Sequence, residues 1–480
     1  MIKYEKVIGL EIHMRIKSET KMFCSCKNAL ALAPEANMHV CPICMWFPGM
    51  LPTLNKQVVK LGLIAGMAMG CEVNKWSQFD RKTYFYPDSP LSYQITQLYH
   101  PIVWGGSVET LVNGTQRAFG IHHMHLEADA GKLSHAGSKT LCDYNRAGSP
   151  LMEIVTDPVF HNEDEVMEFL KELQKMMRAV WVSDADMEKW QMRCDVNLSI
   201  RPEGSTVLNN RTEHKNLNSF SAVGRCIESE FKRQRKAVEA WQEIDQETRW
   251  WDDASGMSSI QRSKEDAMDY RYFPEPDLLP LELEDDFIAE CRATLPELPI
   301  EKRLKYISDW KLAPDDARIL TTHQDLSLYF EELVRLSTDV KKSTSYLTSV
   351  VLGMLHESDD IDQLSELRFD ITQLAEVIKL VNANELSSTN AKQVIEELFA
   401  HGGQSNDIID THNLRQQNDL AWLETIVDDI ISNNPSQVAD YQGWNERIFG
   451  FFVGQCMKAS KGQWNPKIFT DMLKAKLDVS

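Results

Sequence analysis

Apolar and polar residues alternate along the stretch LEIHMRI at residues 10–16. Successive side chains of a strand point to opposite faces of the sheet, so a period of two predicts a strand with one apolar and one polar face. The polar face of this strand carries Glu11, His13 and Arg15.

The same alternation recurs in other segments of the first 295 residues. The polar positions are His123, His125, Glu127 and Asp129; the lone acid Glu153 in LMEIV; Arg193, Asp195, Asn197, Ser199 and Arg201; and Arg211, Glu213, Lys215, Asn216 and Asn218 in RTEHKNLNSF. One such strand is typical of a solvated sheet surface. Several strands rich in His, Asp, Glu, Asn and Arg favour a single sheet with an apolar back and a concave, carboxylate-rich front.

Such a front suits phosphoryl transfer assisted by Mg²⁺. Oxygen ligands hold Mg²⁺ against nucleotide phosphates, while Lys and Arg neutralise the remaining charge. We expect the nucleotide contacts to include Arg193, Asp195, Glu213, Lys215 and Asn216. The sequence has neither G-x-x-x-x-G-K-[ST] nor G-x-G-x-x-G, so ATP would bind without a P-loop.

Helical periodicity appears twice in this part of the chain. Residues 55–70 predict a helix in which Gly62, Gly66 and Gly70 form an intramolecular packing face. Residues 162–180 predict a second helix, with Asn162 at its start and acids in its first turn.

Beyond the prolines near residue 298 the pattern becomes amphipathic and helical throughout. We therefore predict an α+β protein. A mixed domain at 1–295 would be followed by an all-helical domain at 296–405 and, after HGGQSND, by a small helical tail domain at 406–480.

Composition narrows the class of protein. The net charge of −20 argues against non-specific coating of nucleic acid, although the basic stretch 231–236 and the lysines of the tail provide local positive charge. Each of these patches is also typical of a solvated helix face. No apolar run reaches the roughly 20 residues of a membrane span, and the N-terminus lacks a signal-peptide pattern, so we expect a cytoplasmic protein without membrane contact.

Four of the ten cysteines are clustered as CSC and CPIC, at Cys24, Cys26, Cys41 and Cys44. Two close pairs of thiolates suit tetrahedral Zn²⁺, and four sulfur ligands leave no position for water, so the zinc would be structural. The alternative is four buried or redox-active thiols.

Long motifs in the chain resemble one subunit of the tRNA-dependent amidotransferases, the subunit that defines the GatB family. The motifs are VIGLEIHMRIKSETKMFCSC, FDRKTYFYPDSP, HLEADAGKL, NRAGSPLMEIVTDP, MRCDVNLSIRP, RTEHKNLNSF and RSKEDAMDYRYFPEPDL, with a tail similar to the family's small helical domain. They cover nearly the whole chain. The resemblance implies that residues 1–295 form a catalytic cradle domain around an antiparallel sheet and that the tail domain at 406–480 contacts tRNA.

The resemblance implies a ligase that forms a carbon–nitrogen bond. Members of the GatB family use ATP and Mg²⁺ to phosphorylate the side-chain carboxylate of Glu-tRNA(Gln) or Asp-tRNA(Asn). Ammonia released from glutamine by a partner amidase subunit then attacks the acyl phosphate, and a third, small subunit wraps the interface between the other two. Carried over by motif, the magnesium ligands are Glu11, His13, Glu127 and Glu153, the zinc ligands are the four cysteines, and Lys82 and Arg81 line the site or the ammonia route.

Several positions depart from the family pattern. Trp46 stands where a small residue is usual, Leu91-Ser92 replaces Lys-Gly and Trp190-Gln191 replaces Gly-Ser, with further differences at Trp250, Met268 and Trp444. Tryptophan adds a rigid ring and lacks glycine's low-cost access to positive φ angles, so such changes would reshape a pocket.

Three hypotheses follow: the amidotransferase subunit, a diverged paralogue that activates a carboxylate on another aminoacyl-tRNA or uses another nucleophile, and a non-catalytic RNA-binding subunit. The retained acids argue against the third.

Overall fold

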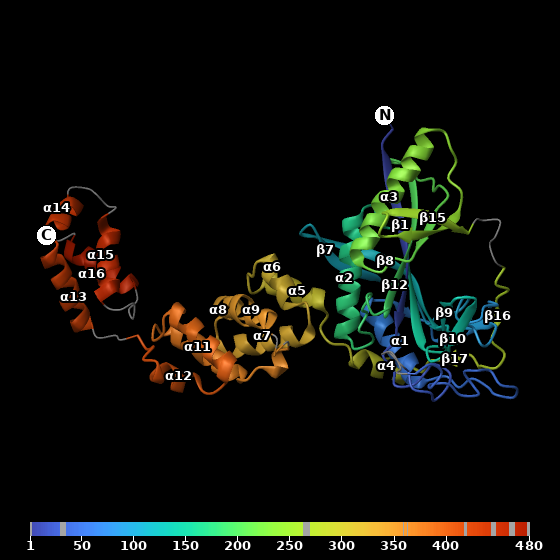
Figure 1. Ribbon diagram of the computed structural model, residues 1–480, viewed down its shortest axis with the longest axis horizontal. Coiled ribbons are helices and arrows are strands. Elements are labelled where there is room, and N and C mark those ends of the chain that lie inside the picture. Colours follow the sequence, from blue (N-terminus) through green and yellow to red (C-terminus); the bar gives the residue numbers. More distant parts are fainter. Residues whose placement is uncertain are drawn as a thin grey trace. The chain divides into compact units, whose positions relative to one another are not determined.

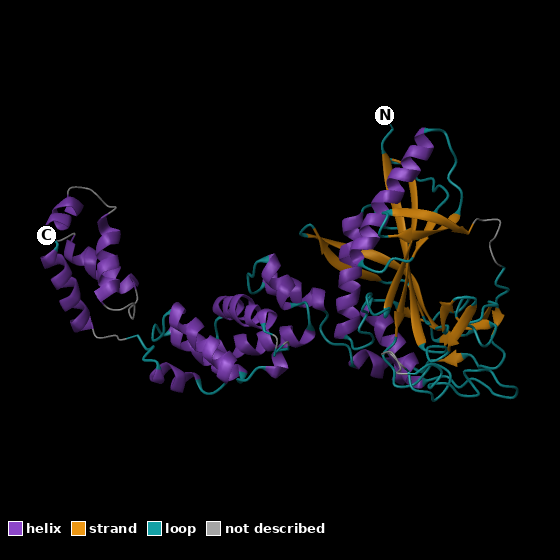
Figure 2. Cartoon of the chain, in the orientation of Figure 1, coloured by secondary structure: helices purple, strands orange, loops and turns teal. Residues whose placement is uncertain are grey.

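A computed structural model describes residues 2–28, 35–262, 269–358, 360–361, 363–416, 420–442, 448–459 and 466–477. Met268 and Trp444 lie outside this part of the chain. The chain forms two compact units, residues 1–302 and 303–480, each with its own secondary structure (Figures 1 and 2). The residue boundaries of the three predicted domains stay a prediction.

The first unit is built on a 10-stranded sheet in the order β15-β14-β13-β12-β1-β11-β8-β6-β2, with β7 paired to β8. All pairs are antiparallel except β13–β14, which is parallel and departs from the expected pattern. The strands are β1 (Tyr4–Arg15), β2 (Glu72–Val73), β6 (Val103–Trp104), β7 (Ser107–Val112), β8 (Thr115–Ala128), β11 (Pro150–Thr156), β12 (Met192–Pro202), β13 (Thr212–Lys215), β14 (Glu247–Asp252) and β15 (Met257–Arg262).

The apolar face of this sheet is covered by helices α2 (Glu163–Ala179) and α3 (Phe220–Glu239), as Figure 2 shows. Ile12, Leu126, Ile154 and Val196 are buried in one hydrophobic cluster with residues of both helices. Burial of apolar surface on this side contributes roughly 25 cal/mol per Å². The predicted division into an apolar back and a polar front is confirmed.

Helix α1 (Lys56–Ala68) begins where the sequence predicted, because the Asn55 side chain accepts a hydrogen bond from the backbone N–H of Gln57. A Cβ atom at Gly62 would lie 2.9 Å from Leu126 Cδ2, and one at Gly66 would lie 2.7 Å from Val103 Cγ1. These two glycines form the expected packing face. Gly70 does not: it has a φ of +67° after the helix end and no atom near its missing Cβ.

Three smaller sheets and one short helix also belong to this unit, and a second short helix spans residue 302, where the unit ends. The sheets pair β4 (Asp80–Thr83) with β5 (Tyr93–Thr96) and β16 (Phe273–Pro274), β9 (Lys132–Ala136) with β10 (Lys139–Asp143), and β3 (Trp76–Ser77) with β17 (Leu281–Glu282); the helices are α4 (Asp285–Ala293) and α5 (Pro299–Ser308).

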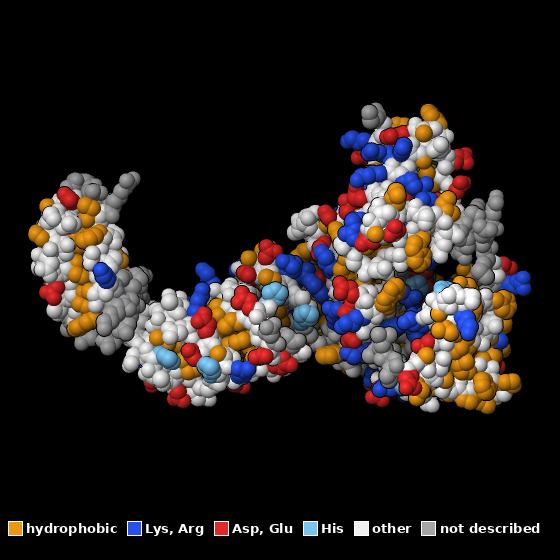
Figure 3. Space-filling view, in the orientation of Figure 1, with side chains coloured by type: hydrophobic (Ala, Val, Ile, Leu, Met, Phe, Trp, Pro, Cys, Tyr) orange, Lys and Arg blue, Asp and Glu red, His pale blue; other side chains and the backbone are white. Residues whose placement is uncertain are grey.

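The basic stretch 231–236 lies in α3, where Figure 3 shows Lys and Arg mixed with Asp and Glu. Lys232 pairs with Glu228, Arg233 with Glu230, and Arg235 with Glu239 of the same helix. This patch therefore has the charge pattern of a solvated helix surface.

Among its described residues, the second unit consists of helices. They are α6 (Pro314–Leu320), α7 (Gln324–Ser337), α8 (Val340–Tyr346), η1 (Leu347–Val351), α9 (Leu352–Glu357), η2 (Leu364–Glu366), α10 (Ile371–Asn382), α11 (Ser388–His401), α12 (Ser405–Thr411), α13 (Leu420–Asn433), α14 (Pro435–Gln442), α15 (Phe449–Ala459) and α16 (Pro466–Leu477). One hydrophobic cluster extends to Ile409 and Leu414, and another contains Leu423, Phe452 and Phe469. The predicted α+β class is confirmed. No described helix combines the length and the apolar character needed to cross a bilayer.

Candidate active site

A row of three polar side chains crosses the front of the sheet. His13 on β1 faces Glu153 on β11, and Glu153 faces His125 on β8. Glu153 Oε2 lies 3.2 Å from His13 Nε2 and 3.4 Å from His125 Nε2. Strand register thus brings together residues more than a hundred positions apart in sequence.

Two further carboxylates converge on the same imidazole. His13 Nε2 lies 3.5 Å from Glu127 Oε1 and 3.9 Å from Glu11 Oε1. Ligand atoms of His13, Glu127 and Glu153 all lie within 4.8 Å of one another, as do those of Glu11, His13 and Asp195. Carboxylate oxygens with one imidazole nitrogen are ligands suited to a divalent cation, so these residues fit the expected magnesium site.

Burial and mutual repulsion of the neighbouring carboxylates shift the pKa values of this site. Burial and the charge of Glu153 raise the pKa of Glu11 to about 7. Burial alone would lower the pKa of His13, but its hydrogen bond with Glu153 and the surrounding carboxylates raise it to about 9. Burial also raises the pKa of Glu127, against the positive charge of His13. A bound cation would relieve this repulsion.

Strands β12 and β13 extend the polar face on the other side of β1. Lys215 Nζ is hydrogen-bonded to Asp195 and lies 2.9 Å from Glu213 Oε1. Glu213 also accepts a hydrogen bond of 2.8 Å from Thr248 Oγ1. The Asp195 and Glu213 charges raise the pKa of Lys215 despite its burial, so its ammonium remains charged beside the cation site.

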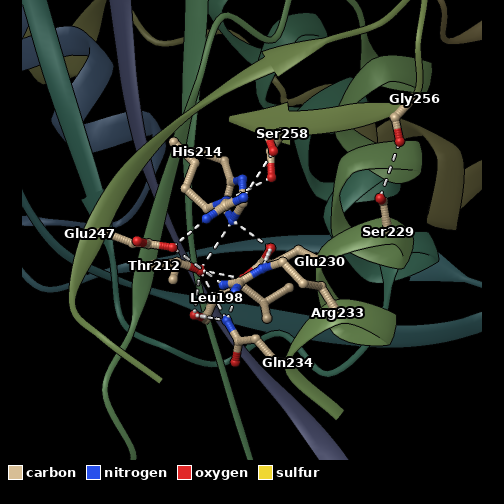
Figure 4. A network of polar contacts seen from close by, with 11 residues as sticks. Leu198, Thr212, His214, Ser229, Glu230, Arg233, Gln234, Glu247, Gly256 and Ser258 are labelled. Carbon is tan, nitrogen blue, oxygen red and sulfur yellow. Dashed lines mark hydrogen bonds and ion pairs between the residues drawn. The ribbon is translucent and has the colours of Figure 1, made fainter. Parts of the chain in front are cut away.

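A buried polar network holds β13 from behind (Figure 4). Thr212 Oγ1 donates a hydrogen bond of 2.8 Å to Glu230 Oε1 of α3, and His214 Nε2 lies 3.6 Å from Glu230 Oε2. Gln234 Nε2 donates to the same Glu230 oxygen at 2.7 Å, and Arg233 Nη2 does so at 2.7 Å. The network fixes β13 against α3 and thereby positions Lys215 on the front of the sheet.

The remaining predicted residues have different surroundings. Lys82 is partly buried, and its interactions with Tyr272 and with the carboxylates of Glu127 and Glu153 raise its pKa against the effect of burial. Arg81, next to it on β4, instead makes two 2.7 Å hydrogen bonds to Glu275. Asn216 has a φ of 67° and donates its amide hydrogen to the Trp251 carbonyl oxygen at 2.9 Å, so its side chain supports the strand.

A pocket of about 220 Å³ adjoins the front of the sheet. Its polar end includes His13, Glu127, Asp129 and Arg193. The other walls are largely apolar and aromatic: Phe23, Trp46, Tyr84, Leu91, Tyr93 and Leu151. Two of the positions at which the sequence departs from the family pattern, Trp46 and Leu91, therefore face the space next to the carboxylates.

Trp46 and Trp190 were expected to disfavour positive φ angles, but both adopt them. Trp46 and Trp190 have φ angles of 53° and 58°, in the left-handed region that favours glycine. Trp46 packs edge-to-face on Tyr93 with ring centroids 5.6 Å apart. Trp190 is about half exposed. The substitutions thus fill space while keeping a glycine-like turn.

The sulfur atoms of Cys24, Cys26, Cys41 and Cys44 lie within 4.8 Å of one another, which fits the predicted zinc knuckle. A hydrogen bond from the Cys24 thiol lowers the pKa of Cys44 to about 5, and the buried Lys21 ammonium, 3.8 Å from Cys44 Sγ, contributes. A positive charge here would offset the excess negative charge that four thiolates place around a bound Zn²⁺.

Some residues around the cation site were not among the predicted ligands. His125 shares a face with Glu127 by the period of two, and that pattern was the signal that could have identified it. Arg15 and Arg146 lie next to Asp129, and Tyr270 lies beside Lys82, but these contacts depend on strand register and loop paths. A single sequence does not determine either.

Comparisons with known proteins identify the family of the chain. Residues 6–289 match the family model described as the GatB/GatE catalytic domain, and residues 328–477 match the model described as the GatB domain. The first unit is thus a catalytic domain of the amidotransferase ligases, which form carbon–nitrogen bonds, and the expectation of an enzyme is confirmed. The chain belongs to the GatB family.

Relatives of similar length support the assignment. The chain is 41% identical over 471 residues to the corresponding subunit of the aspartyl/glutamyl-tRNA(Asn/Gln) amidotransferase of Clostridium botulinum (strain Langeland), covering 98% of both chains. The chain is also 41% identical over 473 residues to the same subunit of Lachnoclostridium phytofermentans, covering 98% of both chains. It is 41% identical over 476 residues to the same subunit of Clostridium tetani, covering 99% of both chains.

Proposed function

We propose that the chain activates the side-chain carboxylate of Glu-tRNA(Gln) or Asp-tRNA(Asn) by phosphorylation from ATP. Ammonia delivered by a partner amidase subunit then displaces phosphate and leaves the amide. The small third subunit and the charged tRNA are the other proposed partners, and the cytoplasm is the proposed compartment.

The observation that carries this proposal is the convergence of Glu11, Glu127 and Glu153 on His13. A carboxylate is a poor electrophile, and phosphorylation converts one of its oxygens into part of a leaving group. Such an enzyme mainly positions two anionic substrates and neutralises their charge. Mg²⁺ held by Glu11, His13, Glu127 and Glu153 would bring the nucleotide phosphates next to the pocket and offset their charge.

The chain's own cations have complementary roles in this proposal. Lys82, Lys215 and Arg193 neutralise the charge that develops on the transferred phosphoryl group. Asp195 and Glu213 hold the Lys215 ammonium in place through the contacts described above. Apolar walls such as Tyr93 and Leu151 limit the access of water, which would hydrolyse an acyl phosphate.

Zinc at the four cysteines would be structural. It would tie the two cysteine pairs to each other next to the pocket, which Cys24 and Cys44 also line. Four sulfur ligands leave no open position for substrate.

An amidation assay tests the proposal. The chain is combined with the amidase subunit and the small subunit, ATP, Mg²⁺, glutamine and Glu-tRNA(Gln) or Asp-tRNA(Asn), and the amino acid released from the tRNA is identified. We expect the amide from the parent chain and at least a hundredfold lower rate from Glu127→Ala, with tRNA affinity unchanged. Glu109→Ala, which changes an exposed acid on β7, is the matched control. Absence of the amide with the parent chain for both tRNAs would contradict the proposal.

A second candidate is supported by the position of Trp46 and Leu91 on the pocket wall. In this alternative the enzyme still activates a carboxylate carried by tRNA, but with another amino acid or another nucleophile. Incubation with a panel of charged tRNAs and γ-labelled ATP distinguishes the two. Label release with neither Glu-tRNA nor Asp-tRNA, but with another charged tRNA, would favour the second candidate.

A further inference from the structure

Four tryptophans of the first unit have a left-handed backbone conformation. The φ angle is 53° at Trp46, 58° at Trp181 and Trp190, and 60° at Trp241. Only a few per cent of residues other than glycine have a positive φ, and a bulky side chain at such an angle is an outlier. The chain has 12 tryptophans, so chance would place about one or none of them at a positive φ.

The same pair of backbone hydrogen bonds closes the turn at all four positions. The N–H of the tryptophan donates to the carbonyl oxygen three residues earlier, at 2.9–3.1 Å. The N–H of the next residue donates to the carbonyl oxygen five residues before it, at 2.8–3.1 Å. This is the hydrogen bonding of the Schellman motif, in which the residue at the positive φ is usually glycine because it has no Cβ.

The side chains at these turns gain little from their surroundings. Helix α2 has its C-cap at Val180 and α3 at Ala240, so Trp181 and Trp241 directly follow the two helix ends. Trp241 is 96% exposed, and Trp181 and Trp190 are each more than half exposed, although tryptophan is highly buried on average. The backbone therefore has the conformation that favours glycine, while packing does not explain the indole rings at these three turns.

Two other tryptophans show how this chain accommodates an indole ring. Trp251 is 1% exposed, and its Nε1–H donates to Asp253 Oδ1 at 3.1 Å. Trp310 stacks on Tyr306 with ring centroids 4.8 Å apart. Neither has a positive φ. The four turns thus form a separate class of tryptophan positions.

UGA is the one codon that some genetic codes assign to tryptophan and others to glycine. We propose that Trp46, Trp181, Trp190 and Trp241 are encoded by UGA and that the cell which carries this gene reads UGA as glycine. The protein made in that cell then has glycine at all four turns. This inference does not rest on the proposed function.

The inference changes one wall of the pocket in front of the sheet. Of the four tryptophans, only Trp46 is among the lining residues. Its ring packs on Tyr93, and the Arg81 guanidinium carbon lies 5.8 Å from the ring centroid. Glycine at position 46 removes these contacts and widens the pocket beside Tyr93. The second candidate function then depends on Leu91 alone.

The nucleotide sequence of the gene and the protein from its own cell test the proposal. We expect UGA codons at the four turns and UGG at Trp251 and Trp310. Peptide mass spectrometry of the chain purified from those cells should find glycine at the four turns and tryptophan at the other two positions. A UGG codon at any of the four turns, or tryptophan in any of the four peptides, would overturn the proposal.

The physical basis is tested separately with the full recombinant chain. Trp181→Gly and Trp241→Gly together should raise the thermal midpoint, because glycine relieves left-handed strain at exposed positions. Trp251→Gly is the matched control and should lower the midpoint, because it empties a buried site. An unchanged or lower midpoint in the double variant would overturn the claim that these turns favour glycine. Neither measurement involves amidation, so failure of the proposed function is seen separately in the amidation assay.

Discussion

His13 on β1 and Glu153 on β11 face each other across an antiparallel ladder, with 3.2 Å between Nε2 and Oε2. The two residues are 140 positions apart in sequence, so only the sheet brings them together. Around this pair the front of the sheet has carboxylates that fit a divalent cation. Separate measurements test the parts of this arrangement and the structure that supports them.

Replacement of His125 by Gln should weaken binding of a divalent cation by about 10–100-fold, because His125 holds Glu153 in place from β8 at 3.4 Å. Isothermal titration with Mn²⁺ measures the affinity. His135→Gln, at an exposed position on β9, is the control and should bind as the parent does. Equal affinity of His125→Gln and the control would show that His125 does not position Glu153.

Removal of zinc should lower the thermal stability of the first unit. We expect elemental analysis to find about one zinc per chain in the parent protein and a clear loss in Cys44→Ser, with a lower thermal midpoint. Cys142→Ser changes a cysteine outside the cluster and should keep the metal. Full zinc content in Cys44→Ser, or none in the parent, would contradict the zinc knuckle.

Replacement by glycine should change the free energy of unfolding in opposite directions at two of the tryptophans with positive φ, Trp190 and Trp46. Trp190→Gly should raise the free energy of unfolding by about 0.5–1 kcal/mol, because it relieves left-handed strain at a half-exposed position. Trp46→Gly should lower it by about 1–2 kcal/mol, because the packing on Tyr93 is lost. Denaturant unfolding measures both values. A shift of the same sign and size in the two variants would contradict this account of the substitutions.

Glu230→Gln should destabilise the first unit by about 3 kcal/mol at neutral pH, because the variant removes the buried carboxylate beside His214 and leaves Arg233 with only the more distant Glu247, at 3.6 Å. Burial alone would raise the pKa of Glu230, but its hydrogen bonds with His214 and Arg233 lower it. A carboxyl group with a lowered folded-state pKa stabilises the fold above its unfolded pKa near 4.5, and this stabilisation is lost as the pH falls further.

The difference in unfolding free energy between the parent and Glu230→Gln should therefore shrink as the pH falls from 5 towards 3. Denaturant unfolding across this range measures it. Glu239→Gln, at the exposed end of α3, is the control and should show little difference at any pH. A difference that stays constant across the range would mean that the Glu230 charge does not stabilise the fold.

Alternation of side chains predicted the division of the sheet into two faces, because burial of one face constrains every second residue. It placed Glu11, His13, Glu127, Glu153 and Asp195 on the same front. The four-cysteine cluster was also predictable, because its ligands lie close together in sequence and their spacing is short.

Other features depend on long-range geometry that one sequence does not specify. Arg81 and Lys82 are adjacent in FDRK, yet Arg81 pairs with Glu275 while Lys82 lies near the carboxylates, because neighbours in a strand point to opposite sides. The parallel β13–β14 pair and the meeting of Arg146 with Asp129 depend on loop paths. The glycine spacing in α1 failed at Gly70 because the helix ends at Ala68.

The central claim is that carboxylates from distant strands hold one divalent cation together with His13. Crystals of the chain soaked in Mn²⁺ test it directly, because anomalous scattering locates the ion. The account predicts a peak within bonding distance of His13 Nε2 and the carboxylates of Glu127 and Glu153, absent from crystals of Glu153→Gln. A strong peak elsewhere, or none between these residues at saturating Mn²⁺, would contradict it.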